Sequence, residues 1–175
     1  MEPRIIEKLK SLVTSEVLLE CPLSKYTSFG IGGPADALVL VQNITELTEI
    51  LKLLHVYSVQ WLVIGKGTNL LVHDEGYQGV ALMLEGDFKS VTIAEDESGI
   101  MVSAGAGYGF SRLSGFCMEN GLTGLEFAAG IPGTVGGAAR MNAGAWGGQI
   151  SDCIENIEVV TLFGRKIIKK EQLEF

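Results

Sequence analysis

Apolar and polar positions in the first half of the chain follow two different periods. Apolar residues at helical spacing predict an amphipathic helix over residues 3–14, with Pro3 in its first turn. A second helix is predicted to begin at Asn43, because a glutamate follows three residues later and apolar positions then recur at helical spacing. Residues 35–41, which are apolar except for Asp36, and the apolar run over 61–64 predict buried strands on either side of this helix. The region should therefore form a βαβ unit with parallel strands.

The second half is predicted to contain shorter elements separated by glycine-rich segments. The acidic run 95–99 reads as a hairpin turn, and Gly121 as the cap of a helix over 111–120. A last hairpin is predicted from a strand over 154–163, a turn at Gly164-Arg165 and a strand over 166–168. The other expected elements are a long loop over 22–34, short strands at Val72, 80–84, 91–94 and 100–104, and a short helix over 135–141.

Composition narrows the class of protein. The chain has 175 residues, of which 47% are hydrophobic and 19% charged, as expected for one globular domain or two small lobes. Its net charge of −8 argues against a nucleic-acid surface, which needs clustered lysine and arginine. No apolar run approaches membrane-spanning length, so no membrane contact is expected. Three well-separated cysteines without metal-ligand spacing fit reduced thiols in the cytoplasm and no metal site.

Glycine-rich segments carry the most information about function. The segment 130–137, Gly-Ile-Pro-Gly-Thr-Val-Gly-Gly, is costly to order, and its main-chain N–H groups are able to cradle phosphate oxygens. A turn between buried elements is the alternative reading. The run 65–69, Gly-Lys-Gly-Thr-Asn, follows a predicted strand directly, where ligands bind in α/β sheets, although it also fits an ordinary strand-exit turn. A third segment, 105–109, either presents N–H groups at a helix N-terminus or forms a turn, and the turn is the favoured interpretation.

Side chains for acid, base or nucleophilic catalysis are not apparent. His55 and His73 lie far apart in the sequence, and structural roles are the better interpretation of both. Arg112 and Arg140 are candidate phosphate contacts, with a surface position as the alternative for each. Many phosphate-cradling loops without a visible catalytic group are typical of a protein whose cofactor supplies the chemistry.

Four motifs, taken in order, resemble the UDP-N-acetylenolpyruvoylglucosamine reductase family, in its second, shorter type. These are Tyr-Thr-Ser-Phe-Gly-Ile-Gly-Gly at 26–33, Gly-Lys-Gly-Thr-Asn-Leu at 65–70, Gly-Leu-Glu-Phe-Ala-Ala followed by the glycine-rich segment at 124–137, and Met-Asn-Ala-Gly-Ala at 141–145. The resemblance implies an α+β, two-lobed FAD-binding domain of the vanillyl-alcohol-oxidase (PCMH) type. The expected lobes are residues 1–85 and 86–175.

The resemblance also implies a cytoplasmic reaction of peptidoglycan synthesis, in which NADPH reduces FAD and the flavin reduces a UDP-sugar. By carry-over, the diphosphate and the rest of the cofactor would contact Tyr26, Gly65, Lys66, Gly67, Thr68, Asn69, Leu70, Gly130, Ile131, Pro132, Gly133, Val135, Gly136 and Gly137. Asn142, Gly144 and Ala145 would lie near the flavin and the nicotinamide or substrate. The family usually has tyrosine where this chain has Trp146, so an aromatic side chain is kept and a hydroxyl is lost.

Catalytic residues of the family have no counterpart in these 175 residues. A Tyr-Arg pair, a proton-donating serine and a glutamate are expected beyond Phe175, in a region that includes a further domain for the UDP-sugar. The chain is therefore expected to be part of a longer protein, to hold FAD, and not to turn over substrate by itself. Two alternatives stay open: a flavin-dependent oxidase of the same fold, and a stand-alone FAD-binding module without catalysis.

Overall fold

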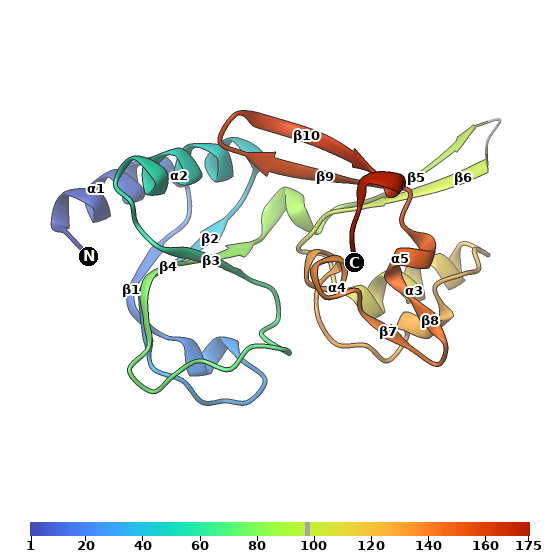
Figure 1. The fold of residues 1–175 in the computed structure, drawn as a ribbon, viewed down its shortest axis with the longest axis horizontal. Helices are drawn as coiled ribbons and strands as arrows, with labels where there is room; N and C mark the ends of the chain where they lie inside the picture. Colours follow the sequence, from blue (N-terminus) through green and yellow to red (C-terminus); the bar gives the residue numbers. More distant parts are fainter. Residues whose placement is uncertain (97–98) are drawn as a thin grey trace. The chain divides into compact units, whose positions relative to one another are not determined.

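The computed structural model describes residues 1–96 and 99–175, and the chain divides into two compact units (Figure 1). The first unit comprises Met1–Gly86 and Val160–Lys166, and the second comprises Asp87–Val159 and Ile167–Phe175. The hairpin formed by the last two strands contributes residues to both units.

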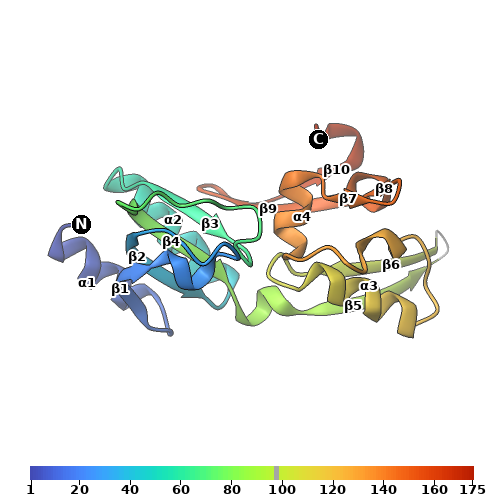
Figure 2. The same cartoon turned by 90° about the horizontal axis from the view of Figure 1, so that it is seen from below.

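The first unit is built on a four-stranded sheet. Strand β1 is antiparallel to β2, whereas β2 and β3 are each parallel to β4, which gives the order β1-β2-β4-β3. Helices α1 and α2 lie on one side of this sheet (Figures 1 and 2). The elements are α1 (Pro3–Leu12), β1 (Val17–Pro22), the 3-10 turn η1 (Leu23–Tyr26), β2 (Pro34–Val41), α2 (Ile44–Val56), β3 (Trp61–Ile64) and β4 (Tyr77–Leu84).

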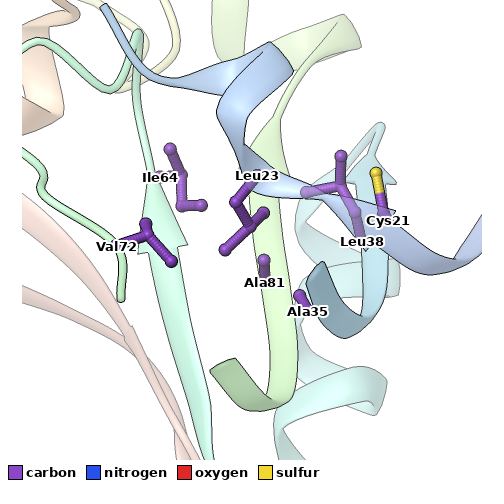
Figure 3. Packing of buried hydrophobic residues seen from close by; sticks show 7 residues of the cluster. All are labelled: Cys21, Leu23, Ala35, Leu38, Ile64, Val72 and Ala81. Carbon is purple, nitrogen blue, oxygen red and sulfur yellow. The ribbon is translucent and has the colours of Figure 1, made fainter. Parts of the chain in front are cut away.

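The side of the sheet that faces away from α1 and α2 carries an apolar cluster of its own. Leu23 of η1 is fully buried and points towards Ala81 of β4 (Figure 3). Val72, in the loop after β3, packs in the same cluster. The loops that connect the strands are therefore anchored by apolar side chains that pack on this face of the sheet.

Glu46 joins three segments of the first unit although its carboxylate is buried. The side chain is 5% exposed. Oε1 accepts hydrogen bonds from the Thr14 main-chain N–H (3.1 Å) and hydroxyl (2.7 Å), and Oε2 accepts one from the Gln42 N–H (2.9 Å). Burial by itself raises the pKa of Glu46, but these hydrogen bonds outweigh burial, and the net pKa is below the ordinary value.

The second unit consists of small hairpins and short helices. Strands β5 and β6 pair antiparallel, as do β7 and β8, and β9 pairs with β10. The elements after β4 are η2 (Gly86–Lys89), β5 (Val91–Asp96), β6 (Gly99–Ala104), α3 (Phe110–Glu119), η3 (Glu126–Ala128), α4 (Val135–Met141), β7 (Gly144–Ala145), β8 (Gly148–Gln149), α5 (Ile150–Cys153), β9 (Asn156–Thr161), β10 (Gly164–Lys169) and η4 (Lys170–Gln172). Of these, β9 and β10 each have residues in both units. Phe110 of α3 is fully buried, with its ring 6.1 Å from that of Phe127.

Most predicted elements are confirmed. Both long helices of the first unit are present, and the side chain of Asn43 caps α2 by accepting from the Glu46 N–H (2.9 Å). The strands on either side of α2 are parallel members of one sheet, as expected for a βαβ unit, with β4 between them. The helix α3 and the short helix α4 are also as predicted. The apex of the predicted turn over 95–99, residues 97–98, lies outside the described residues.

Three predicted elements were wrong, and one strand was missed. Strand β1 was not predicted, because it is an edge strand with an irregular pattern of burial. Val72 lies in a loop and not in a strand. Strand β3 is an edge strand rather than a buried one, with Trp61 45% and Val63 50% exposed. The last hairpin turns at 162–163, because Gly164 is already the first residue of β10.

Candidate cofactor-binding site

Two of the glycine-rich loops lie against each other in the first unit. The Ser28 N–H donates to the carbonyl of Gly67 (3.1 Å). Gly67 has φ +62°, and a Cβ at this position would overlap the carbonyl oxygen of Tyr26. The close approach of the two main chains and the left-handed backbone both require glycine. The shape of the loop over 65–70 therefore depends on this close contact, which a side chain at position 67 would prevent.

This loop presents main-chain donors. Within the described part of the chain, the N–H groups of Lys66, Gly67 and Asn69 have no acceptor at hydrogen-bonding distance. Gly67 is a buried residue, and main-chain amides of buried residues rarely lack a partner in folded proteins. The side chain of Lys66 is exposed and adds positive charge. Such a set of amides beside a cation is suited to binding the oxygens of a diphosphate.

Tyr26 and Leu70 belong to the predicted site, but their side chains have another role. Both pack against the core cluster under the loops. Burial, together with the neighbouring Cys21 thiol, raises the pKa of Tyr26. Packing of these two partly buried side chains holds the loops in place.

The start of α4 differs from what its glycines suggest. The Val135 N–H donates to the Tyr108 carbonyl (2.8 Å), and the Gly136 N–H donates to the Ala106 carbonyl (2.9 Å). The Gly137 N–H donates to the Thr134 hydroxyl (3.2 Å). The expectation of free amides here is therefore wrong, because the segment 105–109, which forms the turn predicted for it, supplies two of the acceptors.

The remaining residues of this segment precede the helix. Gly130 is exposed, and a Cβ added to it would meet nothing within 4 Å. Gly133 has φ +132°, and its carbonyl accepts from the Phe110 N–H (3.1 Å). Ile131 packs against the core cluster around Phe110. Gly130, ahead of the helix, is thus the position of this segment that the structure leaves open to a cofactor.

Asn142 fixes the small hairpin of β7 and β8. It ends α4 in the left-handed conformation, with φ +43°. Its Oδ1 accepts from the Ser151 N–H (3.2 Å), and its Nδ2 donates to Oε1 of Gln149 (3.2 Å). Gly144 and Ala145 form β7 and pair with Gln149 and Gly148. The predicted residues over 142–145 therefore lie together, with the asparagine side chain engaged within the protein.

Other catalytic or ligand-binding groups are scarce. No group of three histidine, cysteine or acidic side chains suited to a metal ion occurs among the described residues. Burial raises the pKa of the Cys117 thiol, and desolvation together with the Asp152 charge raises that of the more exposed Cys153, so neither gains thiolate character near neutral pH. The His73 ring accepts the Glu75 N–H (3.2 Å), a structural role as expected. Searched over the same residues, the fold contains no helix of the length and apolarity that a bilayer requires.

The chain matches a known family of cofactor-binding domains. Residues 35–167 match the model of the FAD-binding domain family, and the chain belongs to this family. The match includes the loop over 65–70, the segment 130–137 and the hairpin over 144–149. The two-lobed α+β fold expected from the resemblance is confirmed.

Its relatives are reductases. The chain is 43% identical over 172 residues to the UDP-N-acetylenolpyruvoylglucosamine reductase of Lachnoclostridium phytofermentans, covering 97% of this chain and 56% of that protein. It is 39% identical over 173 residues to the enzyme of the same name from Bacillus subtilis, with coverage of 98% and 56%. The crystal structure of the Thermus caldophilus enzyme superimposes with a TM-score of 0.73 at 36% identity, covering 91% of this chain and 54% of that one.

A more distant structure shows the fold alone. An alkyldihydroxyacetonephosphate synthase superimposes with a TM-score of 0.68 at 17% identity, covering 97% of this chain and 35% of that one. The chain spans about half the length of the curated relatives that it matches.

Proposed function

We propose that this chain is the FAD-binding portion of an NADPH-dependent reductase that converts UDP-N-acetylenolpyruvoylglucosamine to UDP-N-acetylmuramate in the cytoplasm, during peptidoglycan synthesis. The observation that carries the proposal is the 43% identity to a reductase of that name over 97% of the chain. The substrate would be a UDP-sugar and the hydride donor NADPH. The net charge of −8 is compatible with anionic ligands because main-chain amides supply the anion contacts.

The described residues fit a dinucleotide cofactor. The open amides of Lys66, Gly67 and Asn69 would hold the diphosphate of FAD, and the turn over 130–133 would contact the cofactor through its main chain. The hairpin held by Asn142 would lie near the flavin. When bound, FAD supplies the hydride-transfer chemistry. The role of this chain is to bind and orient the cofactor.

Proton transfer is assigned to a different part of the protein. Desolvation raises the pKa of the Cys117 and Cys153 thiols, which makes both weaker proton donors, and the His73 ring accepts a main-chain N–H in a turn. We propose that the proton donor and most contacts to the UDP-sugar are provided by sequence beyond Phe175. The 175-residue chain would then bind FAD without completing a catalytic cycle.

An assay on the complete reading frame tests this proposal. We expect the complete protein to oxidise NADPH only when the UDP-sugar is present, and the 175-residue chain with FAD to show no such dependence. NADPH absorbance and product mass measure the two results. Oxygen-dependent turnover without the UDP-sugar would instead identify an oxidase. Absence of any turnover by the complete protein, with FAD retained, would identify a non-catalytic module.

A further inference from the structure

Trp146 combines full exposure with an unfavourable backbone conformation. The residue is 95% exposed and has φ +57°, and Gly147 after it has φ +86°. The two residues form the turn between β7 and β8. Two-residue turns with both φ values positive favour Asn-Gly, because a bulky residue is strained in this conformation. At 95% exposure, the indole has almost no packing against the described part of the protein that would offset the strain.

The hairpin beneath the indole is firmly held. Besides the two hydrogen bonds of the Asn142 side chain, the Ile150 N–H donates to the Ala143 carbonyl (3.0 Å). The Gln149 N–H donates to Oδ2 of Asp152 (3.0 Å). A Cβ added to Gly148 would lie 2.8 Å from the Phe127 ring, so this strand packs closely on the core. The structure thus presents a large flat side chain on a fixed base.

A second aromatic side chain, Phe163, is exposed without backbone strain. It is also fully exposed, in the turn of the other hairpin, β9–β10, but it is not among the residues with positive φ. The described non-glycine residues with positive φ are Glu20, Ser58, Asn142 and Trp146, so Trp146 is the aromatic one among them. Isolated exposed aromatic residues are ordinary in soluble proteins. Strain retained at a fully exposed aromatic residue points to a ligand.

We propose that Trp146 is a stacking platform for a planar, electron-poor nitrogen heterocycle. Indole is the most electron-rich of the protein rings and binds electron-poor or cationic partners through its face. The oxidised flavin ring and the oxidised nicotinamide ring share this acceptor chemistry. A flavin partner is expected because the chain belongs to the FAD-binding domain family, which it matches over residues 35–167. A nicotinamide partner rests on the proposed function.

The experiment uses the 175-residue chain with Trp61 replaced by phenylalanine, so that Trp146 is the sole tryptophan. FAD is titrated first, and NADP+ is then titrated into the FAD-loaded chain. We expect one titration to quench Trp146 fluorescence and to produce a long-wavelength charge-transfer band. We expect Trp146→Ala, in the same background, to lose the band and to weaken that ligand by roughly tenfold, as expected for the loss of one stacked ring. The titration that produces the band identifies the ring.

Two controls separate the possible outcomes. Phe163→Ala removes the other exposed hairpin aromatic and should leave both titrations unchanged. Trp146→Gly should raise the melting temperature of the chain without FAD, because it relieves the backbone strain. Equal ligand affinities for Trp146 and Trp146→Ala in a chain that still binds FAD, or a lower melting temperature for Trp146→Gly, would overturn the stacking proposal alone. Failure of the parent chain to bind FAD would instead contradict the proposed function.

Discussion

Replacing Gly67 by alanine is expected to weaken FAD binding by about 100-fold or more and to lower the free energy of unfolding by about 3 kcal/mol. The new Cβ would overlap the Tyr26 carbonyl oxygen, and alanine is disfavoured at φ +62°. The two loops would have to separate, which would move the amides of Lys66 and Asn69. Calorimetric titration with FAD and urea unfolding measure the two effects.

Gly30→Ala is the matched control. Gly30 has a nearly identical φ of +68°, but a Cβ there meets nothing within 4 Å. This variant should lose only the conformational term, about 1 kcal/mol, and should keep its affinity for FAD. If both variants lost FAD affinity equally, the close approach at Gly67 would not be what shapes the site.

Glu46→Gln is expected to lower the free energy of unfolding by about 2–3 kcal/mol at pH 7. The carboxylate accepts from Gln42 and twice from Thr14, and an amide has only one oxygen to offer. The NH2 group of the glutamine is itself a donor and would face one of the Thr14 or Gln42 donors in the buried interior. Glu49→Gln is the control on the same helix, because Glu49 is 47% exposed and forms a surface ion pair with Lys52. That change should cost no more than about 0.5 kcal/mol.

Acidification should reduce the difference between Glu46→Gln and the parent chain. The folded-state pKa of Glu46 is lowered, so its stabilising contribution is fully present above the unfolded-state pKa of about 4.3. The contribution is lost as the pH falls through the lower folded-state pKa. Urea unfolding of both proteins from pH 7 downward measures this convergence. A difference that stays constant through that range would show that the charge of Glu46 contributes nothing.

The parts of the fold that sequence could predict are those with local signals. Helix α2 has a capping asparagine and a regular apolar face, and β2 is apolar except for Asp36 and has a neighbouring strand on each side. Strand β1 lacks such a signal because its partner lies on one side only. The position of β3 at the edge of the sheet depends on β4 inserting between β2 and β3, and this arrangement is not encoded in either strand.

The candidate site divides in the same way. Glycine content located the loop over 65–70, where the structure leaves three amides open. Glycine content also predicted open amides at the start of α4, and this prediction was wrong. The acceptors of its first amides come from the segment 105–109, almost 30 residues earlier in the chain. The strain at Trp146 had no signal except an unusual residue before Gly147 in a two-residue turn. Hydrogen bonds between distant segments, and not composition, decide which amides stay available.

The most direct test of the account is whether the chain itself holds the flavin. The purified 175-residue chain is incubated with excess FAD, passed through a desalting column, and examined by visible spectroscopy. The account predicts a yellow protein with an equimolar amount of FAD, released intact on denaturation. A colourless protein that also gives no heat of binding on titration with FAD would contradict it.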